Sequence, residues 1–171
     1  MATLTLICSN NLIDRNRGRW TAAAIQAMPA QAIGRPATMD HEWDDVMETW
    51  GRIIDARAYT TAPPADIDRM SLTAIATEGY WECEITVEIL TDCPEVLNAL
   101  DKILSENSIG FSYERMMCCD CTCDAKDARS YDCPKTIWEV MASYYDRVGL
   151  LEIFEDSMVL IPANKWAVKV S

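Results

Sequence analysis

Residues 80–90 read YWECEITVEIL, and this stretch predicts a β-strand whose two faces can be assigned from the sequence. Apolar side chains occupy every second position, at Trp81, Cys83, Ile85, Val87 and Ile89. Polar side chains fill the positions between them, at Glu82, Glu84, Thr86 and Glu88. A period of two is typical of an antiparallel strand with one buried face and one face in water. We therefore expect a row of glutamates on the outer face of a sheet.

A helix is expected over residues 40–57, ahead of this strand. Its apolar side chains follow the three- and four-residue spacing of one helix face, at Trp43, Val46, Met47, Trp50, Ile53 and Ile54. Acidic residues crowd the first turn, and Arg52 and Arg57 lie in later turns, which suits the helix dipole. Residues 60–68, which contain two adjacent prolines, then predict a linker.

The other periodic segments complete an α+β pattern. Further strands are expected at residues 3–8, 72–76 and 111–117. Further helices are expected at residues 20–28, ended by Pro29, from Pro94 onward, and at 134–148. The order βαββαβ predicts a ferredoxin-like antiparallel sheet with helices on one face. A C-terminal helix and a β-hairpin around residues 155–157 would follow, all within one domain spanning 1–171.

The charge of the chain restricts its partners. The formal net charge is −12, and residues 1–39 carry four arginines against one aspartate, so the acidity lies in the rest of the chain. Such a chain repels nucleic acid and anionic lipid and attracts basic proteins at long range. The basic run from Arg15 to Arg19 could bind a phosphate, but we expect it to neutralise acidic groups of the same chain. The apolar runs are shorter than a membrane span, and the first 20 residues do not follow the order of a secretory signal, so we expect a cytoplasmic protein.

The glutamate row predicts a partner-binding face. The candidate residues are Glu82, Glu84 and Glu88, with Asp44 and Glu48 on the outer side of the helix expected over residues 40–57. Glutamates on one side of a strand stand about 6.6 Å apart, twice the rise per residue. The leading hypothesis is a non-enzymatic module that docks on a basic surface of a protein or nucleoprotein complex. In its most specific form the module is an inhibitor that mimics nucleic acid and occupies a basic nucleic-acid-binding surface of the partner. Phage-encoded inhibitors of host defence have this charge and size, whereas a simply solvated strand face is the plainer alternative.

A cysteine-rich loop is expected at residues 118–133. Its spacing, Cys118-x2-Cys121 followed by Cys123 and Cys133, could hold a structural zinc ion, with Cys119 able to replace one ligand. Free thiols, disulfides and an iron–sulfur cluster are the alternatives. A zinc-stabilised structural or assembly protein is therefore the second functional hypothesis.

Catalytic motifs give little support to an enzyme. His41 is the single histidine, and its surroundings lack the second histidine of an HExxH zinc motif. Phosphate-binding, dinucleotide-binding and nucleophile-elbow motifs are missing from the sequence. We assign no catalytic residue, and a thiol-dependent enzyme is the third hypothesis. Cys8 and Cys83 are expected to be buried packing residues.

Overall fold

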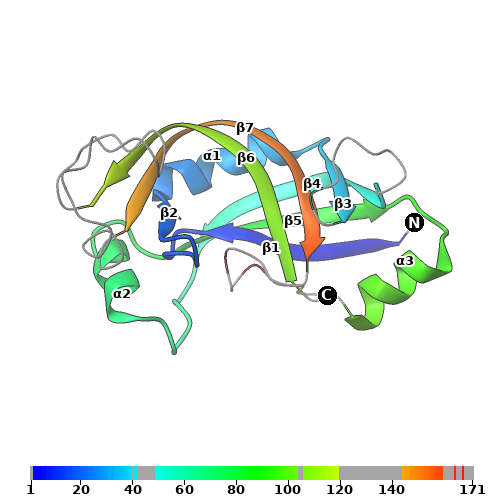
Figure 1. Cartoon of the computed structure of the whole chain (residues 1–171), viewed down its shortest axis with the longest axis horizontal. Coiled ribbons are helices and arrows are strands. Elements are labelled where there is room, and N and C mark those ends of the chain that lie inside the picture. Colours follow the sequence, from blue (N-terminus) through cyan, green and yellow to red (C-terminus); the bar gives the residue numbers. More distant parts are fainter. Residues whose placement is uncertain are drawn as a thin grey trace.

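The structure is a computed structural model, and it describes residues 2–39, 41, 49–103, 106–119, 144–159, 164 and 167. Within these residues seven strands form one mixed sheet that curls into a half-barrel (Figure 1). The strands are β1 (Thr3–Asn10), β2 (Gly18–Trp20), β3 (Pro36–Met39), β4 (Gly51–Thr60), β5 (Trp81–Ile89), β6 (Glu106–Cys118) and β7 (Tyr145–Val159). The helices are α1 (Ala22–Ala32), α2 (Arg69–Ile75) and α3 (Pro94–Asn98), and α3 continues into a π-helical turn, η2 (Ala99–Ile103).

The strand order is β1-β5-β4-β3-β7-β2, and β6 pairs with the other edge of β7. β5 pairs antiparallel with both β1 and β4, whereas β2 and β3 run parallel to β7. In Figure 1 the long β6–β7 pair arches across the molecule, and α1 lies beneath the arch. Because α1 packs against β4, β5 and β7, it fills the hollow of the curled sheet.

One hydrophobic core joins α1 to the inner face of the sheet. Its largest fully buried apolar side chains are Leu6, Ile25, Met28, Trp50, Ile53, Ile85, Val87, Ile153 and Met158. The alternation expected for residues 80–90 is confirmed, because the odd-numbered side chains of β5 face this core and the glutamates lie on the other side. The sheet therefore has an outer face along β1, β5 and β4 that carries polar residues.

The predicted ferredoxin-like fold is wrong, and residues 51–57 show one reason. They belong to strand β4, which pairs with β5 from Gly51 to Thr60, and not to a helix. Trp50 and Ile53 are both buried, and their spacing of three fits a helix face, but Trp50 precedes the strand and so does not follow its alternation. A β-bulge at Ile54 breaks the period of two, so the strand pattern is hidden in the sequence. Most of the predicted helix before Trp50 lies outside the described residues.

Three further predictions are wrong. Residues 72–76 were expected to form a strand, but α2 covers this region, because the Asp68 side chain caps the helix by accepting from the Ser71 amide at 2.9 Å. Residues 145–148 of the last predicted helix are the start of β7, and the hairpin expected at 155–157 is the interior of the same strand. The long ladder with β6 stabilises β7 as an extended strand, and local sequence does not reveal this pairing.

Several local predictions are confirmed. The strand expected at residues 3–8 is part of β1, the strand at 111–117 is part of β6, and Pro94 opens α3. The helix expected at 20–28 begins after Thr21, whose hydroxyl accepts from the Ala24 amide at 3.3 Å. Pro29 does not end it, because α1 continues to Ala32.

Candidate functional site

The predicted glutamate row lies on the outer face of the sheet, where β4 pairs with β5. We call this surface the β4–β5 outer face; it consists of Arg52, Ile54, Asp55, Arg57, Tyr59, Glu82, Glu84, Thr86 and Glu88. The pairing register places Arg52 opposite Glu88 and Arg57 opposite Glu84. Tyr59 lies opposite Glu82 in the same ladder. The two strands thus place a basic or an aromatic residue opposite each glutamate.

Two of the three glutamates form ion pairs across the strands. Arg57 Nη2 lies 2.7 Å from Glu84 Oε1, and Arg52 Nη2 lies 3.5 Å from Glu88 Oε2. The glutamate side chains are 13% and 14% exposed, whereas those of Arg57 and Arg52 are 68% and 57% exposed. The guanidinium groups therefore cover the carboxylates. With four carboxylates against two guanidinium groups, the face keeps a negative charge, but the row is not bare.

Glu82 interacts with two tyrosines instead of an arginine. The Tyr80 hydroxyl donates to Glu82 Oε1 at 2.6 Å. Burial and this carboxylate together raise the pKa of Tyr80 well above its usual value. Burial, followed by the charge and hydrogen bond of Glu82, raises the pKa of Tyr59 to about 12. Both hydroxyls thus remain protonated donors at neutral pH, and the end of the face near Glu82 is held by hydrogen bonds.

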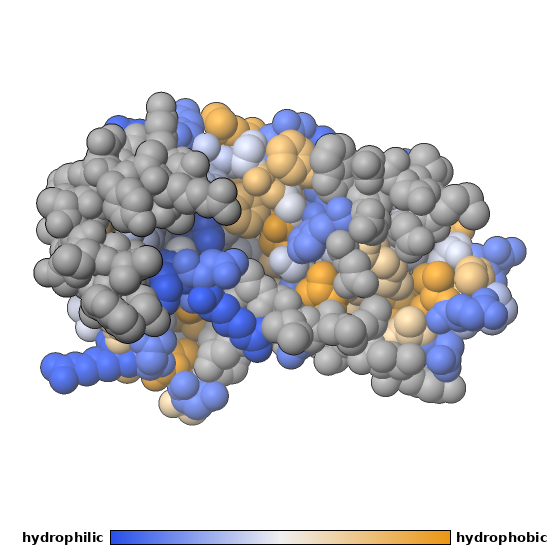
Figure 2. Space-filling view, in the orientation of Figure 1, coloured by the Kyte–Doolittle hydropathy of each residue, from blue (hydrophilic) through white to orange (hydrophobic). Residues whose placement is uncertain are grey.

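Exposed apolar residues do not form a single docking patch on the side of the molecule drawn in Figure 2, where coloured hydrophobic residues lie in separate spots among hydrophilic ones. The large apolar side chains exposed in the described part of the chain come from separate elements: Ile33, Ile54, Leu72, Leu90, Leu97, Leu151 and Phe154. Of these, Ile54 lies on the β4–β5 outer face, because the bulge turns it away from the core.

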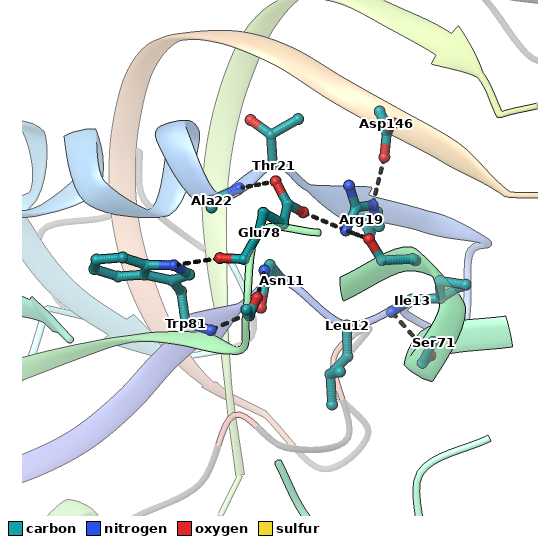
Figure 3. A network of polar contacts seen from close by, with 12 residues as sticks. Asn11, Leu12, Ile13, Arg19, Thr21, Ala22, Ser71, Glu78, Trp81 and Asp146 are labelled. Carbon is teal, nitrogen blue, oxygen red and sulfur yellow. Dashed lines mark hydrogen bonds and ion pairs between the residues drawn. The ribbon is translucent and has the colours of Figure 1, made fainter. Parts of the chain in front are cut away.

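Arg19 is the centre of a second polar network, drawn in Figure 3. Its guanidinium is buried and lies 2.5 Å from both Glu78 and Asp146, and it donates to the Ala74 carbonyl at 3.0 Å. Glu78 also accepts from the Ala22 amide at 3.0 Å, at the start of α1. The network joins β2, α1, α2 and β7. It confirms the expectation, for Arg19, that the basic run neutralises acidic groups of the same chain.

A third polar cluster surrounds the adjacent residues Glu155 and Asp156, which we call the β7 acid pair. A β-bulge at Phe154 moves the Glu155 side chain to the side opposite Ile153. Ser157 Oγ donates to Glu155 Oε2 at 2.5 Å, and Thr38 Oγ1 donates to the same oxygen at 3.0 Å. His41 Nδ1 lies 2.7 Å from Glu155 Oε1. The carboxylate is buried, and these contacts replace the water that it loses.

Asp156 lies on the core side of β7, in a different environment. Its Oδ1 atom is buried without a hydrogen-bond partner among the described residues, and its Oδ2 atom lies 3.4 Å from the Asn107 amide. The narrow gap beside it is lined mainly by apolar groups and has no room for a water molecule. Burial, followed by the charge of Glu155, raises the pKa of Asp156 well above its usual value. A neutral, protonated carboxyl group fits this setting.

Asn107 supports a protonated Asp156. With its amide turned so that the nitrogen donates to the Ile7 and Ala167 carbonyls, at 3.0 and 3.2 Å, its oxygen faces the Asp156 carboxyl. Two oxygen atoms form a hydrogen bond only if one carries a proton. Asp156 would then donate to Asn107, and the buried amide would be fully bonded.

The structure places only part of the predicted metal and partner sites. Cys118 is buried at the end of β6, opposite Tyr145, and Cys119 Sγ accepts from the Tyr144 amide at 3.5 Å. The other proposed ligands, Cys121, Cys123 and Cys133, lie outside the described residues, as do Asp44 and Glu48. The described residues contain no group of three possible metal ligands. The zinc site therefore stays a prediction.

Sequence reasoning missed the arginines of β4 and the environment of Glu155. Arg52 and Arg57 were assigned to a helix, and a strand reading of residues 51–60 would have placed them beside the glutamates. Glu155 was assigned to a turn because three polar residues follow one another there. Its contacts with Thr38 and His41 span more than 110 residues, and no local pattern signals them.

Comparison with other proteins does not identify a family. Among the described residues no helix has the length and apolar character needed to cross a membrane. No family model matches the chain, and no curated protein or solved structure is significantly similar to it.

Proposed function

We propose that this protein is a non-enzymatic binding module that docks on a basic surface of a partner protein through the β4–β5 outer face. The observation that carries the proposal is the ordered set of charged and aromatic side chains on two paired strands, with a net negative charge. The chain charge of −12 adds a long-range attraction for basic proteins.

The composition of this face fits a protein–protein contact. Arginine and tyrosine are enriched in such interfaces, and Arg57 and Tyr59 are neighbours here, with the Arg57 guanidinium 5.4 Å from the ring centre. Glu84 holds Arg57 in place, which reduces the side-chain entropy lost when a partner binds. Ile54 supplies an exposed apolar side chain on the same face. The face thus offers charged, aromatic and apolar contacts on a rigid sheet.

The ion pairs argue against the hypothesis that this face mimics nucleic acid. Mimicry of nucleic acid needs a row of uncovered negative charges, because phosphates are recognised by lysines and arginines. Arg52 and Arg57 cover two of the three glutamates. A partner surface with several basic groups and some acidic ones complements this mixed face better than a surface built for a phosphate backbone.

The test compares two variants with equal change in total charge. The first combines Glu82→Gln, Glu84→Gln and Glu88→Gln on the face. The second combines Asp66→Asn, Asp92→Asn and Asp101→Asn, which are exposed residues outside the β4–β5 outer face. Tagged wild-type protein and both variants are used to capture partners from an extract of the cells that produce the protein, at low and high salt.

The two variants give different results if the proposal is right. Wild type and the aspartate variant are expected to retain a basic protein at low salt and release it at high salt, while the glutamate variant fails to retain it. The glutamate variant also frees two arginines, so its face becomes positive. Equal capture by both variants, or capture of no basic protein by wild type, would contradict the proposal.

A further inference from the structure

Two buried cysteines lie side by side in the β1–β5 ladder. Cys83 of β5 is opposite Ser9, and Cys8 is the extra residue of a β-bulge between Ile7 and Ser9. Both side chains are buried members of the same core cluster. In a β-bulge two residues of one strand face a single residue of the other, so Cys8 and Ser9 both lie across from Cys83. Register partners such as Ser9 and Cys83 have Cα atoms about 4.5–5.5 Å apart, and disulfides need about 4.4–6.8 Å. The bulge thus makes Cys8 a cross-strand neighbour of Cys83.

A small cavity reaches Cys8, one member of this pair. Its volume is about 30 Å³, it is partly open to solvent, and Cys8 lines it. Its polar lining consists of Ser9, Asn10, Asp14, Ser108, Arg147 and Asn164. A site needs roughly 10–15 Å³ to hold one water molecule, so this cavity can admit two water-sized oxygen atoms. Hydrogen peroxide is an oxidant of this size and polarity.

We propose that Cys8 and Cys83 form a reversible disulfide in the folded protein, with hydrogen peroxide as the oxidant that reaches Cys8 through this cavity. In the first step the Cys8 sulfur attacks one peroxide oxygen, the O–O bond breaks, and the products are a sulfenic acid and water. In the second step the Cys83 sulfur attacks the Cys8 sulfur, the S–O bond breaks, and a second water leaves with the Cys83 proton. The two thiols are oxidised by two electrons, and one peroxide is reduced to two waters.

The environment predicts a slow reaction. The hydrogen bond to Cys83 and burial raise the pKa of the Cys8 thiol, so little thiolate is present at neutral pH. The pair should therefore respond to sustained peroxide and not to a brief pulse. Once formed, the disulfide would join β1 covalently to β5.

The experiment uses the full chain under native conditions. Reduced protein is treated with hydrogen peroxide, and samples are quenched and unfolded at intervals so that all free thiols can be alkylated before peptides are mapped by mass spectrometry. The expected product is a peptide pair linked through Cys8 and Cys83, which dithiothreitol separates. Cys93, which is partly exposed on the N-terminal side of α3, serves as the internal reference for an accessible thiol.

Two variants test the mechanism. In Cys83→Ser the sulfenic acid on Cys8 has no thiol beside it, so a dimedone adduct on Cys8 should accumulate when the oxidised protein is unfolded in the presence of dimedone. In Ser108→Met a larger side chain enters the cavity, and oxidation of Cys8 should slow severalfold while that of Cys93 does not change. Reduced Cys8 and Cys83 in protein whose Cys93 is fully oxidised would overturn the proposal. An unchanged rate in Ser108→Met would overturn the cavity as the route.

Discussion

The β4–β5 outer face and the β7 acid pair both place carboxylates on the central strands of one sheet, yet they stabilise them in different ways. On the outer face, arginines of the neighbouring strand lie over Glu84 and Glu88, and solvent still reaches the guanidinium groups. At the β7 acid pair, Glu155 is bonded to hydroxyl groups and His41, and Asp156 lies in an apolar gap. The same chemical group is a surface charge in one place and a core component in the other.

This difference predicts how much a substitution in each region should change the stability of the fold. Exposed ion pairs contribute little to stability, because water and salt screen them. A buried polar group is costly to leave without its partner, since nothing replaces the lost bond. The acid pair should therefore control stability, whereas the outer face is available for binding.

Removal of the buried carboxylate should have the largest effect. Glu155→Ala leaves Thr38, Ser157 and His41 without their shared acceptor, and we expect the free energy of unfolding to fall by about 3–5 kcal/mol. Urea denaturation measures this change. Glu152→Ala on the same strand is the control, because Glu152 is half-exposed and its pair with Arg35 should contribute less than about 1 kcal/mol. Similar losses in both variants would contradict the comparison.

The pH dependence of stability should change in Asp156→Asn. The pKa of Asp156 is raised in the folded protein, so its stabilising contribution is complete below the unfolded pKa near 4 and is lost as pH rises toward the folded pKa. Wild type should lose up to about 1.4 kcal/mol per pH unit from this group, and the asparagine variant should not. Unfolding curves from pH 4.5 to 8 measure the difference, with Asp66→Asn as an exposed control. Parallel curves for Asp156→Asn and wild type would show that Asp156 is ionised in the fold.

Gly110 should tolerate no side chain. A Cβ atom there would collide with Glu155 Oε1, and the contact with His41 holds that oxygen in place. We expect Gly110→Ala to lower stability by about 1–3 kcal/mol. Thermal unfolding measures the effect of Gly110→Ala in the wild-type background and in the Glu155→Gly background, where the side chain that the new Cβ atom would meet is absent. If the alanine is equally destabilising in both backgrounds, contact with Glu155 is not the cause.

The ion pair of Arg57 and Glu84 should give the smallest effect. A double-mutant cycle of Arg57→Gln and Glu84→Gln is expected to give a coupling energy below about 1 kcal/mol, and less at high salt. Urea denaturation of the four proteins provides the measurement. A coupling of several kcal/mol would mean that this face stabilises the fold as the acid pair does.

The sequence predicts those parts of the fold where a residue's environment follows from its neighbours along the chain. The alternation of β5 and the proline that opens α3 are of this kind. β4 and β7 could not be predicted, because β-bulges at Ile54 and Phe154 interrupt their alternation and because their pairing depends on distant strands. The glutamate row was predicted because it lies on the regularly alternating β5. The arginines that cover it were not predicted, because they lie on the bulged strand β4.

The most direct test of the proposed function is the affinity for the captured basic partner. The dissociation constants of the glutamate variant and of the charge-matched aspartate variant are compared at one salt concentration by isothermal titration calorimetry. The account predicts at least about tenfold weaker binding for the glutamate variant, equivalent to roughly 1.4 kcal/mol. Equal dissociation constants would show that total charge, and not the β4–β5 outer face, determines binding.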